Sequence, residues 1–379
     1  MQYPGRWHVF KRYVAKRQPD LAAQMMIVSL CEDDLIKFDG TLGRALFLKR
    51  AAVLIAGLCL VSAGRVEAAD ITFVADAPFN GASLNDPSLL ACSHQLTGPI
   101  VASDVSDIPA RLNQPASQAE RSYNAPIVLC LNSEGGSFQA GIELAKVFRE
   151  RQIITMIEPG ARCVSACAIA FMGGGFSEMS EYGQAYRVLH PGGQLGFHAP
   201  AITLPEVPLP GSVVSDVYQT AQKDLGEAIQ KLSIKPSWDF SRQPIIPNSL
   251  FVQMMLTPSE SMFYVTTVNE AALWEIELPL RVTVQDLRRY VQGACHNSFA
   301  WAQGVSAQPI SEADIERTTL EYSGGDIQIV RGADTDETAI CKYNRYGELS
   351  TTSVQASGRF FRNFLEGIPG PTDLSTLTK

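Results

Sequence analysis

The chain has 379 residues, of which 46% are hydrophobic and 18% are charged. These fractions are typical of a globular protein and exclude an intrinsically disordered one, and the length suits one large domain or two ordinary ones. Residues 1–68 carry ten Lys or Arg and six Asp or Glu, which leaves 21 basic and 33 acidic residues in 69–379, a net charge of −12. That acidic surplus argues against nucleic acid and anionic membrane surfaces as partners.

The first 68 residues are typical of an export signal and are set aside from the fold. Three basic residues between positions 44 and 50 precede a 13-residue apolar run at 51–63, and "VEA" follows at 66–68. This order predicts a secretory signal peptide that is cut between Ala68 and Ala69, and hence a periplasmic or secreted protein. The apolar run is shorter than the about 20 residues that a membrane span needs, which favours a cleaved signal peptide. An uncleaved membrane anchor is the alternative.

Strands and helices alternate between about 71 and 280. Apolar runs predict strands at 92–101, 125–131, 153–157 and 193–200, and the continuous runs are typical of strands buried on both faces. The first run is followed by a helix that Ser106 or Asp107 caps. The second is followed by an amphipathic helix at 137–152, in which Phe138, Ile142, Ala145 and Phe148 share one face and Glu143, Lys146 and Arg149 the other. Such alternation implies parallel strands with right-handed crossovers.

The second half of the chain changes character twice. Three prolines mark 203–212 as a linker or extended loop, and 213–234 has the apolar spacing of a long amphipathic helix. After 280, short β-like runs follow a helix-like segment. We therefore predict three parts, namely the leader 1–68, an α/β domain at 69–280, and a small C-terminal α+β module of unknown role at 281–379.

Three polar or glycine-rich pieces stand where predicted strands end, which is where open parallel sheets bind ligands. "NSEGGS" brings Gly135 and Gly136 before a helix, which suits an oxyanion hole but also a plain tight turn. Ser165 stands before "ACAIAFM", where it is either a nucleophile or a helix-capping serine. His198 ends "LGFH", where it is either a general base or a satisfied core histidine.

The order of these pieces resembles the Clp protease proteolytic subunit of the ClpP/crotonase superfamily. The similarity begins at "HQLTGPIVASDVSDIPARL" and continues through "LNSEGGSFQAGIELAKVF", "GARCVSACA", "LGFHAP" and "SMFYVTTVNEAALWEIEL", so it covers roughly 92–280. It looks closest to an exported, cysteine-flanked branch of that superfamily. The resemblance implies the family's parallel-sheet core of spiral ββα units within 69–280.

The resemblance also implies roles for particular residues. It makes Ser165 the nucleophile, His198 the general base, and the amides of Gly135, Gly136 and Ala166 the oxyanion donors. Glu134 replaces the family's proline before Gly-Gly, and Arg162, Cys163 and Val164 replace part of its small-residue run. The family's orienting acid has no counterpart, because the closing segment places Thr257 near its position. The candidates for the third member are Thr257, Glu260 and Asp239.

Six cysteines lie in 69–379, an even number that indicates disulfides in an exported chain. They are Cys92, Cys130, Cys163, Cys167, Cys295 and Cys341. Cys295 and Cys341 are a candidate pair within the C-terminal module. Cys163 and Cys167 have three interpretations, which are a disulfide with each other, disulfides to neighbouring strands such as that of Cys130, and metal ligation with His190 or His198. The spacing is a poor match to zinc sites, so we expect no metal.

These observations lead to a function hypothesis and its competitors. The first is an exported serine hydrolase, a peptidase of the Clp type that acts through an acyl-enzyme on short or unfolded peptides. Export removes ATP, so we expect no ATPase partner and no cofactor, while the helix at 213–234 resembles the family's subunit-packing helix and predicts a homo-oligomer. The second is a catalytically inactive binding or assembly protein of the cell envelope. Crotonase-like acyl chemistry is a third, which export argues against because coenzyme A thioesters are intracellular.

Overall fold

The computed structural model describes residues 68–74, 90–112, 126–177, 183–201, 208–233, 244–280, 286–317, 319–323, 326–331, 339–343, 349–351 and 368–377, with the strands after 318 described by their backbone. The chain divides into two units, Met1–Val66 and Glu67–Lys379, and all described residues belong to the second. The predicted leader lies outside the described residues except for Ala68. The predicted boundary between 280 and 281 stays a prediction.

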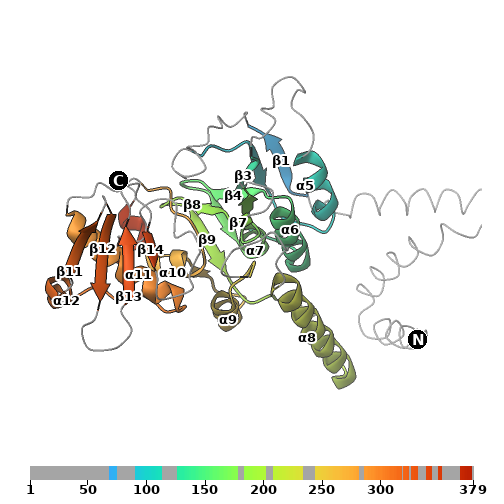
Figure 1. Cartoon of the computed structure of the whole chain (residues 1–379). Coiled ribbons are helices and arrows are strands. Elements are labelled where there is room, and N and C mark those ends of the chain that lie inside the picture. The colour runs from blue at the N-terminus through green and yellow to red at the C-terminus, as the bar shows by residue number, and fades with distance from the viewer. Residues whose placement is uncertain are drawn as a thin grey trace, which may run out of the picture. The chain divides into compact units, whose positions relative to one another are not determined.

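A five-stranded, mostly parallel sheet forms the core, in the order β1-β2-β3-β4-β8 (Figure 1). Strands β2, β3, β4 and β8 run parallel, and β1 pairs antiparallel with β2 at the edge. The strands are β1 Asp70–Phe73, β2 His94–Thr97, β3 Val128–Asn132, β4 Ile154–Ile157 and β8 Arg187–Leu189. Every residue of β4 and all but the last of β3 are buried, as continuous apolar runs predict. The mixed α/β fold with a mostly parallel sheet is therefore confirmed.

A second, three-stranded sheet carries the serine segment. Strand β5, Arg162–Val164, pairs parallel with β9, Gln194–Phe197, and β10, Phe263–Tyr264, pairs antiparallel with β9. The sequence placed Ser165 after the strand at 153–157, but a further strand, β5, intervenes and moves the chain to the other sheet. Strands β5, β8 and the hairpin of β6, Gly175–Ser177, and β7, Gly183–Ala185, have three residues each, too few to show a periodicity.

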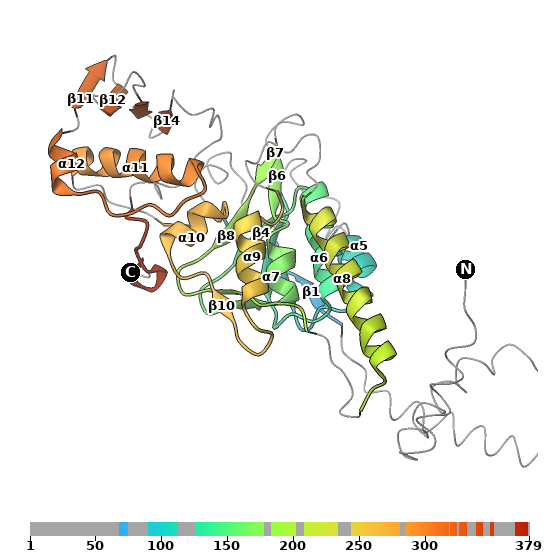
Figure 2. The ribbon, with the colours of Figure 1, turned by 90° about the horizontal axis from the view of Figure 1, so that it is seen from below.

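Helices cover the sheets, and one of them, α6 (Phe138–Glu150), packs against three other helices (Figure 2). Its predicted apolar face is largely confirmed, since Ile142, Ala145 and Phe148 are fully buried. The helices of this part are α5 Asp104–Leu112, α6 Phe138–Glu150, α7 Ala166–Phe171, α8 Gly211–Ser233, α9 Asn248–Leu256 and α10 Val268–Leu273. Helix α5 begins at Asp104, two residues before the predicted cap Ser106, and the carboxylate of Asp104 accepts from the backbone N–H of Val101 and of Ala69.

Arg149 corrects the predicted polar face of α6. Its side chain is fully buried, and its guanidinium donates to the carbonyls of Met172 at 3.4 Å and Gly173 at 3.3 Å. These carbonyls follow α7, where the last turn of a helix leaves acceptors without intrahelical partners. Arg149 therefore serves as a side-chain cap for α7 inside the core.

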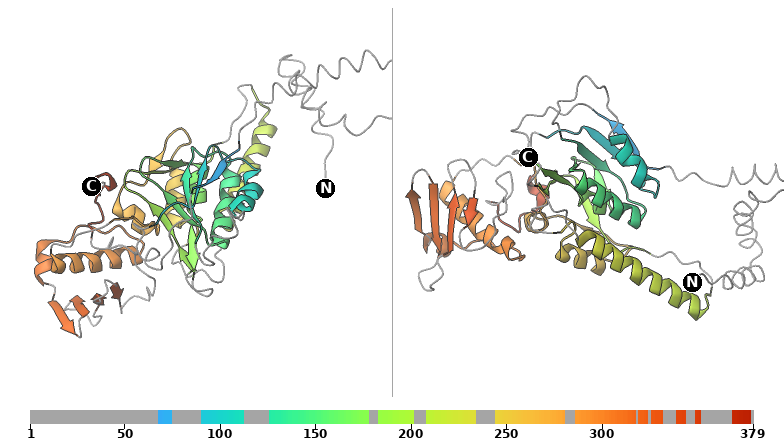
Figure 3. Two further views of the ribbon diagram at one scale, coloured as in Figure 1. Left: turned by 90° about the horizontal axis from the view of Figure 1, so that it is seen from above. Right: turned by 45° about the vertical axis from the view of Figure 1, so that its right-hand side comes forward.

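Helix α8 is long and extends past its neighbours (Figure 3). Only Ala228 and Leu232, near its C-terminal end, are buried. That end is tied to α6 by an ion pair of 2.8 Å between Lys231 and Glu143. Val214 and Tyr218 in the first half are 45% and 62% exposed, so this half presents apolar side chains to solvent.

The C-terminal residues form helix and antiparallel sheet, the α+β composition that the sequence predicts. The elements are α11 Leu287–Ala302, α12 Glu312–Arg317, β11 Thr319–Ser323, β12 Asp326–Arg331, β13 Ala339–Tyr343, β14 Leu349–Thr351 and η3 Leu374–Leu377. The four strands pair antiparallel in chain order. In the described part of the chain, no helix has both the length and the apolar character needed to cross a membrane.

Disulfides bear out the reading of the cysteines. Cys92 is bonded to Cys130, and Cys163 to Cys167. Cys295 on α11 is also disulfide-bonded, and its predicted partner Cys341 lies on β13, where only the backbone is described. Disulfides form and persist in oxidising compartments, which agrees with an exported protein.

Candidate active site

Backbone hydrogen bonds place the three predicted pieces next to one another. The N–H of Ser133, before the Gly-Gly pair, donates to Arg162 O at 2.7 Å, and Val164 N–H donates back to Ser133 O at 3.2 Å. On the other side of β5, Ser165 N–H donates to Gly196 O at 3.0 Å. The Gly-Gly loop, the serine and the end of the histidine strand therefore lie side by side in that order.

Ser165 has a backbone conformation that L-residues rarely adopt. Its φ is 57° and its ψ −125°, at the junction of β5 and α7. Such a conformation costs about 1–3 kcal/mol in a residue with a Cβ, and such residues cluster at functional sites. A capping serine would accept from an amide of the first helical turn, but the Ser165 side chain makes no cap hydrogen bond. The half-buried hydroxyl is therefore not committed to the helix, which removes the capping interpretation.

Gly135 is packed directly against the serine. A Cβ added at Gly135 would lie 2.7 Å from the Cβ of Ser165 and 2.9 Å from the amide nitrogen of Ala166. Its φ of +93° is also a conformation in which a side chain is strained. A glycine that served only a tight turn could lie away from the serine and leave space for a Cβ. The plain-turn interpretation therefore does not explain the close packing of Gly135 against Ser165.

The three predicted oxyanion amides are not equivalent. Gly135 N–H donates to Ser133 Oγ at 3.1 Å and is thus engaged within the loop. Among the described residues, no acceptor is bonded to the N–H of Gly136 or of Ala166. Ala166 opens α7, so its amide is one of those that a helix leaves without an intrahelical partner. Gly136 and Ala166 are therefore the two amides that remain for a ligand.

Ser133 is a residue whose role the sequence did not reveal. Its hydroxyl donates to Gly98 O at 2.5 Å while accepting from Gly135 N–H. The side chain is 4% exposed, so these bonds are shielded from water. It stands in the quoted "NSEGGS", two residues before Gly135, but nothing in that pattern distinguishes a loop-bracing hydroxyl from a solvated one.

His198 follows the last residue of β9, on the strand that neighbours the serine. The register pairs Val164 with Gly196, so Ser165 comes one residue and His198 two residues after this last pair. His198 Nδ1 lies 2.7 Å from Ala199 O. A carbonyl only accepts, so Nδ1 carries the proton and the lone pair of the neutral ring is on Nε2. In the described part of the chain, no hydrogen bond joins this ring to the Ser165 hydroxyl.

The three candidates for the third member differ in position. Thr257 is close, because its carbonyl accepts from Ala199 N–H at 2.9 Å, but its hydroxyl donates to Gln253 O at 2.9 Å. Glu260 is exposed and accepts from Ser259 Oγ at 3.1 Å. Asp239 lies outside the described residues. Within those residues, the group that holds the His198 ring is a neutral carbonyl and not an acid.

A charged group borders the site on the side of the Gly-Gly loop. Arg162 forms an ion pair of 3.4 Å with Glu134 and donates to the Tyr264 hydroxyl at 3.0 Å. Both members of the pair are well exposed, so it contributes little to stability. Its residues are those that replace the proline and a small residue of the resembled family.

The Cys163–Cys167 disulfide brackets the serine. Cys163 lies on β5 and Cys167 on α7, both with no exposed surface, so the bond ties the strand and helix on either side of Ser165. With the two sulfurs bonded to each other, the interpretation of these cysteines as metal ligands is wrong.

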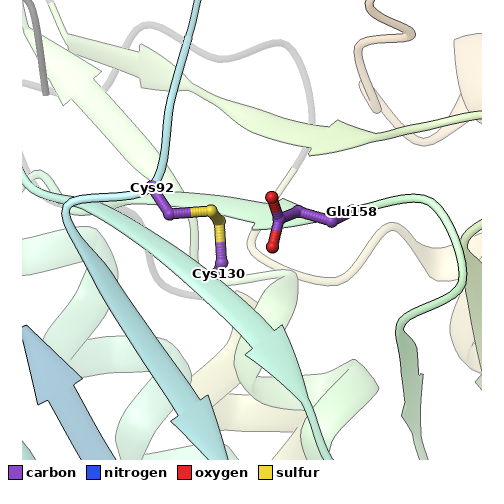
Figure 4. A group of neighbouring side chains, drawn as sticks. All are labelled: Cys92, Cys130 and Glu158. Atoms are coloured by element: carbon purple, nitrogen blue, oxygen red, sulfur yellow. A yellow bond between two sulfur atoms is a disulfide. The ribbon is translucent and has the colours of Figure 1, made fainter. Parts of the chain in front are cut away.

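One cluster has the composition of a metal site. The sulfurs of Cys92 and Cys130 and a carboxylate oxygen of Glu158 lie within 4.8 Å of one another (Figure 4). Metal ligation by cysteine requires thiolates, and here the two sulfurs form a disulfide. The cluster is therefore not a metal site in this oxidised form.

Comparison with known proteins adds no assignment. No protein-family model matches the chain, and a search of curated proteins finds no significant match to it.

Proposed function

We propose that this protein is a serine hydrolase in which Ser165 is the nucleophile and His198 the general base. The observation that carries the proposal is the strained, uncapped Ser165, which lies between a Gly-Gly loop and a histidine strand. Backbone strain of this kind persists only where the surrounding structure enforces it, and the flanking disulfide and the packing of Gly135 do so here.

The residues supply each step of an acyl transfer. Nε2 of His198 takes the proton of the Ser165 hydroxyl as its oxygen attacks the carbonyl carbon of the substrate. The amides of Gly136 and Ala166 donate to the resulting oxyanion, and His198 then gives its proton to the leaving group. Water, activated by the same histidine, releases the acyl group from Ser165. Ala199 O holds the tautomer that this sequence of steps requires.

The particular protein we propose is a peptidase with a ClpP/crotonase-like core, similar to the Clp protease proteolytic subunit. The parallel sheet and the order Gly-Gly, serine, histidine along the chain support it. An exported protein has no ATP-driven unfoldase, so the substrates are short or already unfolded peptides, and no cofactor takes part. The exposed apolar side chains on α8 favour assembly into a homo-oligomer.

Labelling by a fluorophosphonate probe tests the proposal. The probe forms a bond to an activated serine, so the oxidised wild-type protein is expected to be labelled and Ser165→Ala is not. His198→Gln is expected to slow labelling at least 100-fold, which is the lower end of the usual contribution of a general base. The control is Ser259→Ala, an exposed serine outside the site, which should label like wild type. Labelling that persists in Ser165→Ala, or no labelling of the wild type, would refute the proposal.

A second function rests on a specific observation. Within the described residues, no carboxylate orients His198, and the Ser165 hydroxyl is not yet bonded to it. A catalytically inactive binding or assembly protein of the cell envelope would retain the fold and the loop without labelling. The same experiment separates the two functions.

A further inference from the structure

The carboxylate of Asp104 is buried at the N-terminal edge of the sheet. Asp104 is 1% exposed, and its Oδ2 accepts from Val101 N–H at 2.7 Å and from Ala69 N–H at 3.3 Å. Among the described residues these two amides are its hydrogen-bond partners, and no cation forms an ion pair with it. Removing a carboxylate from water is costly unless an opposite charge is close.

Ala69 is the residue at which the predicted mature chain begins. Hydrolysis of the bond between Ala68 and Ala69 adds the OH of a water to the Ala68 carbonyl carbon and its hydrogen to the Ala69 nitrogen, which then takes up a proton. The amide that now faces Asp104 thereby becomes an ammonium. Ala69 is 5% exposed, so the new charge is buried together with the carboxylate when the cleaved chain folds.

We propose that signal cleavage supplies the missing cation, so that the Ala69 ammonium pairs with Asp104 and fixes the loop that carries the oxyanion amides. The bond from an amide to the carboxylate is already charge-assisted, but an ammonium adds an opposite charge, and the attraction between two charges is stronger where water is excluded. The precursor, which offers only an amide, holds this region less firmly than the mature chain does.

Two routes, made of hydrogen bonds and close packing, connect Asp104 to the Gly-Gly loop. Val101, which donates to Asp104, follows Ile100, whose N–H donates to Gly135 O at 2.8 Å and whose carbonyl accepts from Ser137 N–H at 2.8 Å. Ala69 and Gly98 are also close, because a Cβ on Gly98 would lie 3.7 Å from the Ala69 Cα.

Gly98 O in turn accepts from Ser133 Oγ, the group that holds Gly135 N–H. The Ala69 terminus thus supports the Gly-Gly loop along both routes, one through Ile100 and one through Gly98. This second half of the inference rests on the proposed function, whereas the ion pair does not.

The other charged groups on the elements packed here have partners of their own. Arg111 on α5 forms an ion pair of 2.8 Å with Asp70 on β1, and Asp107 accepts from Ser106 Oγ at 3.0 Å. Arg151, which follows α6, donates to Pro109 O at 3.1 Å. The Asp70–Arg111 pair is 40–59% exposed, so water screens it from the buried carboxylate. The titration that the proposal concerns is therefore that of the new α-amino group opposite Asp104.

The experiment compares three full-length chains that a bacterial host exports and processes. They are the wild type, a chain with one glycine inserted between Ala68 and Ala69, and Asp104→Asn. The insertion leaves the cleavage site intact but moves the ammonium by about 3.5 Å. N-terminal sequencing is expected to show that the wild type begins at Ala69, and amine acylation at neutral pH is expected to be at least tenfold slower for the native protein than for the unfolded one.

Thermal unfolding provides the second readout. The wild type is expected to unfold about 5 °C above the glycine-insertion chain at pH 7, and Asp104→Asn should remove the benefit of the correct N-terminus. The pair needs a protonated α-amino group, so its contribution is expected to be lost at alkaline pH, where that group gives up its proton.

Each outcome bears on one claim. A mature N-terminus other than Ala69, equal midpoints for the wild type and the insertion, or unprotected acylation would overturn the ion pair. Ser165 labelling is expected to fall at least tenfold in both variants. If the ion pair is found but labelling stays equal in all three chains, the coupling to the loop is refuted. If no chain labels at all, the proposed hydrolase fails and the ion pair stands.

Discussion

A methyl group added at Gly135 tests the contact between the loop and Ser165. The Cβ of Gly135→Ala would lie 2.6 Å from Val164 O and 2.7 Å from Ser165 Cβ, distances that real Cβ atoms do not show. Two costs combine, which are about 1–2 kcal/mol for an L-residue at φ +93° and about 1–3 kcal/mol for overpacking. We expect a loss of about 2–5 kcal/mol of unfolding free energy, together with at least tenfold slower labelling of Ser165.

Gly160→Ala is the matched control. Gly160 has a similar φ of +78°, but a Cβ there would meet nothing within 4 Å. It therefore carries the backbone cost alone, about 1–2 kcal/mol, and labelling should be unchanged. Urea denaturation gives the free energies. Equal destabilisation by the two substitutions, with normal labelling of Gly135→Ala, would show that the loop does not touch the serine as described.

Three further predictions concern the disulfide and helix α8. Replacing Cys163 and Cys167 by alanine should cost about 2 kcal/mol, the value for so short a closed loop, and should slow labelling at least tenfold; unchanged labelling would separate the disulfide from the site. Lys231→Met should cost about 0.5–1 kcal/mol in urea denaturation at pH 7, whereas Lys223→Met, in an exposed pair within the helix, should cost less. Burial tends to raise the pKa of Glu143, but its bonds to Lys231 and Lys146 lower that pKa below 4.5. The bond to Glu143 raises the pKa of Lys231 above 10.5. The stabilisation by the Lys231–Glu143 pair should therefore be present between these two values, and should vanish as the pH falls through the lowered pKa or rises through the raised one. Val214→Glu should convert the expected homo-oligomer to monomers in light scattering while Gln219→Glu, also at an exposed position, should not, and a monomeric wild type would exclude assembly.

The parts of the fold that the sequence predicts are those governed by local pattern. Strand β3, the Gly-Gly break and helix α6 follow from a buried apolar run, two glycines and a helical period within 25 residues. Strand β5 could not be predicted, because three residues carry no period and its pairing with β9 depends on residues about 30 positions later. The burial of Arg149 depends likewise on carbonyls 23 and 24 positions away.

The candidate site divides in the same way. Ser165 and His198 could be proposed because serine and histidine side chains are visible in the sequence. Their supports could not, since three of them are backbone groups, namely the carbonyls of Gly98, Gly196 and Ala199, which every residue type possesses. The positive φ of Ser165 could not be predicted either, because glycine is the residue type whose presence in a sequence indicates a positive φ.

The hydrogen bond from His198 to the carbonyl of Ala199 determines how much catalytic rate is lost when no acid orients the histidine. In the serine-protease triad, replacing the acid by its amide lowers kcat about 10⁴-fold because the histidine takes the wrong tautomer. A carbonyl accepts and never donates, so Ala199 O holds the proton on Nδ1 and leaves Nε2 free for the serine. What it lacks is the negative charge that stabilises the imidazolium formed during attack. Under the proposed function, the loss expected is therefore the electrostatic part alone, and we expect labelling and hydrolysis by Ser165 to be slow but measurable.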